Sequence, residues 1–99
     1  MKLYFIVCCS NPMKVKIGYA KDPMKRLADM QVACPFTLEL VGTLEAKSLA
    51  NARELEKRAH EAFAALHVRG EWFDYNKRTA RKISRWLFER HPKLGSKRI

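Results

Sequence analysis

Acidic residues and long apolar runs are both scarce in this chain. Its 99 residues carry 20 Lys and Arg against 10 Asp and Glu, which gives a formal net charge of +10 at pH 7. No apolar run approaches the ~18 residues of a membrane-spanning helix, and the apolar stretch at 2–9 is too short for a secretory signal. We therefore expect no transmembrane helix. The positive charge predicts attraction to a polyanion, with nucleic acid ahead of an anionic membrane surface.

Cysteine is also scarce, and its spacing does not suit metal binding. The three cysteines, Cys8, Cys9 and Cys34, are an odd number, and no C-x-x-C pair occurs. Cys8 and Cys9 would point to opposite faces of a strand, so no bond between them is expected. Zinc sites need spaced ligand pairs. We expect reduced, structural cysteines and a cytoplasmic protein, associated with the nucleoid if the source is bacterial or phage.

The common catalytic motifs are absent as well. The chain has no Gly-rich phosphate loop, no G-x-S-x-G, no H-E-x-x-H and no paired Cys-His cluster. Internal repeats, linkers and low-complexity tracts are absent too. Because 47% of the residues are hydrophobic, a folded core is expected. We predict one domain over residues 1–92, which includes a basic C-terminal helix, and a basic tail at 93–99.

Hydrophobic patterning predicts an α+β fold with the element order β-β-α-β-α-α. The predicted strands are Leu3–Cys9, Lys14–Tyr19 and Phe36–Ala46, and the predicted helices are Pro23–Val32, Ser48–Leu66 and Lys77–His91. Asp22 caps the first helix, which would bury Met24 and Leu27 and leave Arg26 off this face. A bulge is expected at Gly42. We therefore expect a small three-stranded antiparallel sheet, begun by a hairpin and flanked by helices.

The last helix and tail are strongly basic. Residues 77–99 hold nine Lys and Arg against the single acid Glu89. At helical spacing, Arg78, Lys82 and Arg85 share one face, and Arg81 lies near it. Cations beside phosphates release counterions on binding, so we expect this face to contact nucleic acid. A membrane surface and an ordinary solvated helix face are the alternatives.

Tyr4, Lys16 and Arg26 form the first set of candidate catalytic residues. An unperturbed phenol has a pKa of about 10 and is a poor base at neutral pH. A nearby ammonium lowers that pKa, so Lys16 is expected to prepare Tyr4 to take a proton from water. Arg26 would then hold the phosphate as its charge develops. The alternative is a core tyrosine with two surface cations.

Glu56 and His60 form the second set, one helical turn apart. A carboxylate at the edge of an apolar stripe can bind Mg²⁺, which keeps several waters and needs few protein ligands. His60 would donate to a phosphate or orient Glu56. The alternative pairs Glu56 with Arg53 or Lys57 and makes His60 a satisfied, half-buried histidine.

The other acids are less convincing metal ligands. Glu54, Glu71 and Asp74 are expected to be exposed. Trp72 and Phe73, which follow Glu71, either close the core, which we prefer, or offer a stacking surface for a base. A wall beside the glutamate helix is a further alternative.

Five short segments carry more information by their order than by themselves. They are Leu3-Tyr4-Phe5-Ile6, Val15-Lys16-Ile17-Gly18-Tyr19, Lys25-Arg26-Leu27, Leu55-Glu56-Lys57-Arg58-Ala59-His60 and Gly70-Glu71-Trp72-Phe73. In this order the chain resembles the GIY-YIG nuclease superfamily, in particular the compact branch of phage and meiotic proteins with V-K-I-G and G-E-W-F motifs. The resemblance covers residues 3–75. It implies a small antiparallel sheet flanked by helices and cleavage of DNA phosphodiesters with one divalent metal, Mg²⁺ or Mn²⁺.

The resemblance also implies roles for single residues. Tyr4 matches the tyrosine of the first signature, Arg26 the catalytic arginine, and Glu56 the metal-binding glutamate. Lys16 takes the place of the tyrosine in the second signature, and His60 matches a histidine of the compact branch. The first signature also lacks its glycine here. The general base is then Tyr4 assisted by Lys16, unless the other tyrosine at position 19 reaches the site.

These inferences lead to a hypothesis of a metal-dependent DNA endonuclease with low intrinsic sequence specificity. Its substrate is double- or single-stranded DNA, and a partner protein would supply any targeting. Tyr19 and Arg53 are expected to contact nucleic acid together with the basic helix. The alternative is a non-catalytic nucleic-acid-binding module with the same fold. A weaker alternative is an interaction domain whose basic surface meets an acidic protein.

Overall fold

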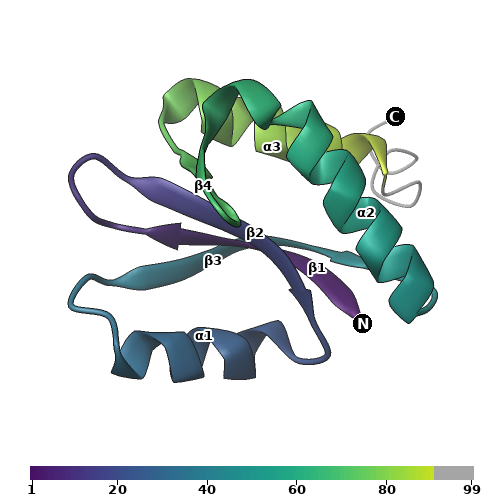
Figure 1. Ribbon diagram of the computed structural model, residues 1–99, viewed down its shortest axis with the longest axis horizontal. Helices are drawn as coiled ribbons and strands as arrows, with labels where there is room; N and C mark the ends of the chain where they lie inside the picture. The colour runs from purple at the N-terminus through teal and green to yellow at the C-terminus, as the bar shows by residue number, and fades with distance from the viewer. Residues whose placement is uncertain (91–99) are drawn as a thin grey trace.

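The computed structural model describes residues 1–90. The elements are β1 (Lys2–Cys8), β2 (Lys14–Ala20), α1 (Pro23–Val32), β3 (Leu38–Glu45), α2 (Leu49–Ala62), β4 (His67–Arg69), β5 (Trp72–Asp74) and α3 (Lys77–Glu89). A single 3₁₀ turn, Ala64–Leu66, follows α2. Figure 1 shows α2 and α3 on one side of the sheet and α1 on the other. The predicted α+β class is therefore confirmed.

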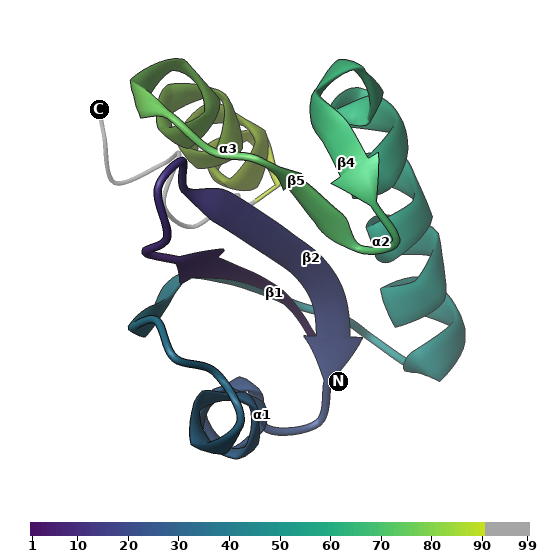
Figure 2. The ribbon, with the colours of Figure 1, turned by 60° about the vertical axis from the view of Figure 1, so that its left-hand side comes forward.

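The sheet has five antiparallel strands in the order β3-β1-β2-β5-β4, so the prediction of three strands is wrong. β4 and β5 are joined by a tight turn at Gly70, which has a positive φ of 53°. β5 then pairs with the first half of β2, at Lys14–Lys16 (Figure 2). Each added strand has only three residues, which is too short for a periodic pattern to be read from the sequence.

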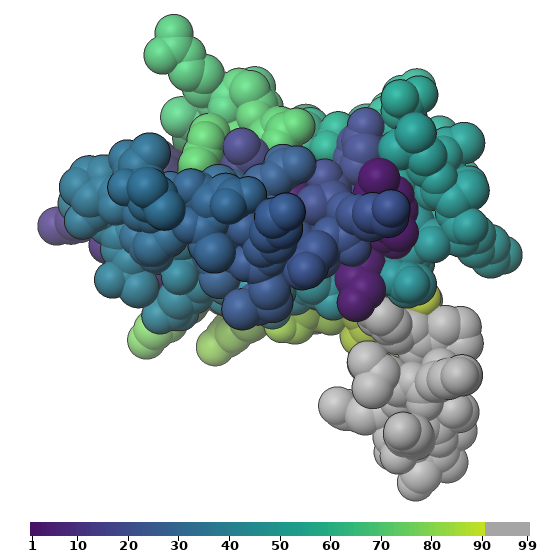
Figure 3. Space-filling model, turned by 90° about the horizontal axis from the view of Figure 1, so that it is seen from below, coloured from purple at the N-terminus to yellow at the C-terminus, as the bar shows by residue number. Residues whose placement is uncertain are grey.

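Alternation along β1 divides the core between the two faces of the sheet. Leu3, Phe5 and Val7 point to the face under α2 and α3, whereas Tyr4 and Ile6 point to the face under α1. The first face is closed by Ala59, Phe63, Ile83 and Trp86, and the second by Leu27, Met30 and Leu38. Figure 3 looks onto the second face, where α1 (blue) covers much of the surface.

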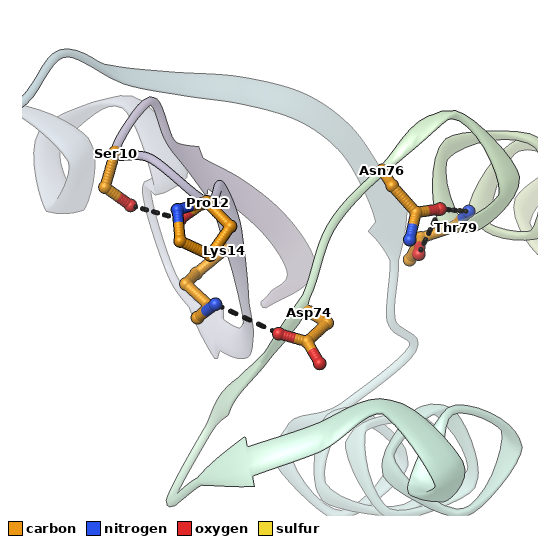
Figure 4. A network of polar contacts seen from close by, with 6 residues as sticks. All are labelled: Ser10, Pro12, Lys14, Asp74, Asn76 and Thr79. Carbon is orange, nitrogen blue, oxygen red and sulfur yellow. Dashed lines mark hydrogen bonds and ion pairs between the residues drawn. The ribbon is translucent and has the colours of Figure 1, made fainter.

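Side-chain caps set the helix starts close to their predicted positions. The Asp22 carboxylate accepts from the backbone N–H of Lys25, and the Asn76 side chain accepts from the backbone N–H of Thr79 (Figure 4). α2 ends four residues before its predicted end at Leu66, because the chain tightens into the 3₁₀ turn. The bulge expected at Gly42 is confirmed by a shift in register opposite Phe5. The predicted tail and the domain boundary at residue 92 lie outside the described residues.

The buried face of α1 differs from the prediction. Met24 is 59% exposed, whereas Pro23 is buried and Leu27 and Met30 pack against the sheet. Because Pro23 follows β2 after only two residues, the buried stripe starts at the first residue of the helix. Arg26, three residues after Pro23 and four before Met30, therefore borders the buried face and reaches the sheet.

Replacing Phe5 with Ala should lower the free energy of unfolding by about 3–5 kcal/mol. The ring is fully buried and packs edge-on against the rings of Phe63 and Trp86. Urea denaturation followed by circular dichroism measures the loss. Phe36→Ala removes a ring that is 47% exposed and, as the control, should cost less than about 1 kcal/mol. Equal losses in the two variants would contradict this placement of Phe5.

Candidate active site

The site is built around Gly18, at the point where β1 and β2 pair closely. Gly18 lies opposite Tyr4 in the register of the two strands. A Cβ atom at position 18 would lie 2.6 Å from the Tyr4 hydroxyl oxygen and 2.9 Å from Oε1 of Glu71. Only glycine leaves room here for both side chains. The glycine of the second signature therefore has a steric role, which is to let a phenol and a carboxylate meet above β2.

Arg26 reaches this point from α1. Its Nη1 donates to the Tyr4 hydroxyl at 3.5 Å, while the side chain remains exposed to solvent. The contact places a permanent positive charge at the mouth of the site, next to the buried phenol. Two residues that are 22 positions apart in sequence thus meet, while the phosphate-binding role of Arg26 stays a prediction.

Lys16 pairs with Glu71 instead of with Tyr4. The Lys16 Nζ lies 3.8 Å from Oε1 of Glu71 and 5.8 Å from the centre of the Trp72 ring. The side chains of Lys16 and Glu71 are 24% and 42% exposed. Glu71, expected to be exposed and a less convincing metal ligand, is therefore a half-buried member of the site. The G-E-W-F motif contains Glu71, but its contact with Lys16 follows only from the pairing of β5 with β2.

The pKa of Tyr4 is raised above its ordinary value, so the expectation that Lys16 lowers it is wrong. Burial of the phenol is the largest cause, and the negative charge of Glu71 is the next. Arg26 opposes both effects by its charge and its hydrogen bond. Because Lys16 is paired with Glu71, its charge does not act on the phenol as predicted. Tyr4 thus stays a neutral hydrogen-bond donor at neutral pH.

Glu56 and His60 approach from α2. The pKa of Glu56 is raised by burial and then by Glu71, while His60 and Lys16 act in the opposite direction. The Nε2 atom of His60 lies 2.9 Å from the Ile17 carbonyl oxygen, to which it donates as the Nε2–H tautomer. Glu56 and His60 line a cavity of about 560 Å³ together with Lys57, Glu61, Ala64, His67 and Phe73. His60 is therefore hydrogen-bonded to the sheet, which agrees with the alternative of a satisfied, half-buried histidine.

The alternative for Glu56, an ion pair with Arg53 or Lys57, is absent among residues 1–90. Arg53 instead donates through Nε to the Tyr19 hydroxyl at 3.4 Å, which brings these two predicted DNA contacts together. Arg26 lines a different cavity, of about 430 Å³, with Ala20, Lys21, Asp22, Lys25 and Asp29. Arg26 and Glu56 thus line separate cavities, and of the site residues Tyr4 and Glu71 are the ones that come within 3 Å of a Cβ at Gly18.

The basic face of α3 does not border this site. α3 lies over β3, where Leu87 Cδ1 would be 2.5 Å from a Cβ at Gly42, and β3 is the sheet edge opposite to β5 and β4. Lys82 donates to the Ala62 carbonyl at 3.3 Å and lies over the Phe63 ring, so it caps the end of α2. Arg78, Arg81 and Arg85 remain exposed on a separate surface.

The donor chemistry fits a hydrated hard cation and not an all-protein cage. Within the described chain no three His, Cys, Asp or Glu residues are grouped to hold a metal. The three cysteines are free thiols, as predicted. Glu56, half-buried beside the second carboxylate of Glu71, offers the oxygen ligands that Mg²⁺ accepts while keeping most of its waters. No helix in residues 1–90 is long and apolar enough to cross a membrane.

This fold and site define a nuclease-like domain related to the GIY-YIG group. The chain belongs to the T5orf172 domain family, whose model matches residues 1–88. The resemblance inferred from the ordered motifs is thereby confirmed at the level of this family. No curated protein and no solved structure gives a significant match.

The phenol of Tyr4 should ionise only above its ordinary pKa of 10.0, because burial and Glu71 disfavour the phenolate. The ultraviolet absorbance of phenolate in the wild type, minus that in Tyr4→Phe, measures this ionisation. The unfolded chain ionises Tyr4 first, so stability falls as pH rises from the unfolded pKa to the folded one. Tyr4→Phe should lack this part of the alkaline loss. A Tyr4 phenolate that forms below pH 10 would contradict the burial argument.

Proposed function

We propose that this chain is a divalent-metal-dependent DNA endonuclease that hydrolyses phosphodiester bonds with low intrinsic sequence specificity. The observation that carries the proposal is the hydrogen bond that Arg26 donates to Tyr4, a phenol whose pKa is raised by burial first and also by the charges of Glu71 and Glu56. The cation for the phosphate comes from α1 and the carboxylate for a metal from α2, on opposite faces of the sheet. Membership of a nuclease-like family supports this assignment.

The charge around the site suits a nucleic-acid backbone. Lys21, Lys25 and Arg26 lie on the α1 side, and Arg53 and Lys57 on the α2 side. A strand laid across the end of β2 would pass between these two groups of cations, and its phosphates would release counterions. Contacts of this kind position a backbone without reading bases, which supports low sequence specificity.

The basic face of α3, with Arg78, Arg81 and Arg85, is a second surface for the proposed DNA contact. It lies over β3 and away from the site. We assign to it the retention of a longer duplex and not the positioning of the scissile phosphate. Lys82, which caps α2, contributes less to this surface than the sequence predicted.

Each proposed catalytic residue follows from its surroundings. Glu56 would hold Mg²⁺ or Mn²⁺, which supplies Lewis acidity that stabilises the leaving oxygen. Arg26 would bind the non-bridging phosphate oxygens, whose charge grows in the transition state. Tyr4, neutral and buried, would hold the Arg26 guanidinium in place through the hydrogen bond that it accepts. His60 would keep α2 and Glu56 in place through its bond to the Ile17 carbonyl.

A non-catalytic nucleic-acid-binding module is the second candidate. It is favoured by one observation, which is that Tyr4 is 0% exposed and so does not face a bound strand. Such a module would keep the cations around β2 and the basic face of α3 but would not cut. Cleavage assays separate the two candidates directly.

The wild-type chain should nick supercoiled plasmid with Mg²⁺ or Mn²⁺ and not with EDTA. Arg26→Ala and Glu56→Gln should each reduce the rate at least ~100-fold, because the first removes the cation that stabilises the transition state and the second removes the carboxylate that would hold the metal. Gel electrophoresis over time measures the rate, and single-stranded DNA is tested in parallel. Glu54→Gln, on the same helix but in an exposed ion pair with Arg58, is the matched control and should retain the wild-type rate. DNA that is retarded but uncut would support the binding module, and equal nicking by Glu56→Gln would place the metal elsewhere.

Glu56→Gln should also raise the melting temperature at neutral pH, by about 2 °C. The raised pKa of Glu56 means that the folded state disfavours its charge. Removing the charge stabilises the folded chain above both pKa values, and the gain disappears at acid pH, where the wild-type carboxyl is protonated. Thermal melts at neutral and acid pH measure the difference. A lower melting temperature at neutral pH would show that the ionised form is stabilised.

A further inference from the structure

Hydrolysis needs a group that takes the proton of the attacking water, and Tyr4 does not suit this role. Its hydroxyl is fully buried and accepts a hydrogen bond from Arg26, which leaves its own hydrogen to be donated. Lys16 lies in an ion pair and carries its positive charge there. His60 uses Nε2 on the Ile17 carbonyl and packs edge-on against Phe73, 5.0 Å away.

Glu71 has the properties that these groups lack. Its Oε1 lies within 3 Å of the same point above Gly18 that the Tyr4 hydroxyl approaches, at 2.9 Å and 2.6 Å respectively. The side chain is 42% exposed, so water reaches the carboxylate. The backbone fixes it as well, since the Glu71 carbonyl accepts from the Ile17 N–H at 2.9 Å.

Lys16 gives this carboxylate a defined orientation. One oxygen, Oε1, faces the ammonium at 3.8 Å, and Lys16 is itself steadied over the Trp72 ring. A carboxylate accepts hydrogen bonds through two oxygens, so the ion pair leaves the second oxygen able to accept from water. The charged and titratable groups that face Glu71 are Lys16, Tyr4 and Glu56, with Arg26 and His60 behind them.

We propose that Glu71 is a further catalytic residue, the general base that accepts the proton of the attacking water, and that Lys16 positions it. The inference rests on the proposed endonuclease function and names the group that activates its nucleophile. It also explains the lysine in the second signature, which serves to orient a carboxylate from the turn that precedes β5.

The step balances without a further reactant. The water oxygen forms a bond to phosphorus as the bond to the leaving oxygen breaks. The water proton passes to the Glu71 carboxylate, and the leaving oxygen takes a proton from solvent. Glu71 then returns its proton to solvent, and the net reaction is hydrolysis. General-base catalysis of this kind contributes about 10²–10⁴-fold to a rate.

Single-turnover cleavage of a labelled duplex by the full chain tests the assignment. Glu71→Gln should lower the rate at least ~100-fold while leaving the affinities for DNA and Mn²⁺ within about threefold of wild type. Glu71→Asp, which keeps a carboxylate, should recover at least ~10-fold of this loss. Fluorescence anisotropy and isothermal titration with Mn²⁺ measure the affinities without requiring cleavage.

Asp74→Asn is the matched control. Asp74 forms another ion pair with β2, from the far end of β5, in which it contacts Lys14 at 3.0 Å (Figure 4). It lies outside the site, so this variant should cut at the wild-type rate. A comparable loss in Asp74→Asn would show that Glu71 matters only for the pairing of β2 with β5, which would overturn the proposal.

The remaining outcomes also decide the question. Glu71→Gln cutting within threefold of wild type, with Tyr4→Phe inactive, would return the role to Tyr4 and leave the endonuclease function standing. Loss of Mn²⁺ binding in Glu71→Gln would make Glu71 a metal ligand and overturn its role as base. A wild-type chain that binds DNA and Mn²⁺ without cutting overturns the proposed function, and this inference with it.

Discussion

The close pairing of Tyr4 with Gly18 is the constraint on which the rest of the site depends. Because Gly18 has no side chain, the Tyr4 ring of β1 lies over the backbone of β2, in space that a Cβ atom at position 18 would fill. A slip of one residue in the register of β1 and β2 would move Tyr4 to the face under α2 and α3. It would also replace the buried contacts of Leu3 and Phe5 with a polar ring. The apolar alternation of β1 therefore secures the geometry of the site as well as the core.

The sheet separates the functional groups and then brings them together at one strand. α1 carries Arg26 on one face, and α2 carries Glu56 on the other. β5 pairs with β2 only along Lys14–Lys16, so the second half of β2 keeps an edge without a strand partner among the described residues. Both helices approach this edge. A chain of this size thus places opposite charges on one stretch of backbone without a deep cleft.

Electrostatics at the site favours reactivity over stability. Two carboxylates, Glu56 and Glu71, lie near one buried phenol, and the charge of Glu71 raises the pKa of both Glu56 and Tyr4. Lys16 and Arg26 offset part of this repulsion from opposite directions. The protonation of Glu56 and Tyr4 should respond strongly to an added charge, because a bound cation would reduce the electrostatic repulsion that raises their pKa values. Clusters of this kind are typical of functional sites.

Local pattern in the sequence determined the long elements, their caps and the faces of the hairpin strands. The alternation along residues 14–19 and the cap at Asp22 involve only residues that are close in sequence, so both can be predicted without knowing the fold. The order of five motifs also identified the family and pointed to Tyr4, Arg26 and Glu56. Only the tertiary structure decided that β5 pairs with β2, that Lys16 pairs with Glu71 and not with Tyr4, and that α3 packs over β3, the sheet edge opposite to β5 and β4. The pairing of β5 with β2 joins segments more than 50 residues apart, as the contact of Lys16 with Glu71 shows. A strand of three residues is too short for its sequence pattern to indicate which strand it pairs with.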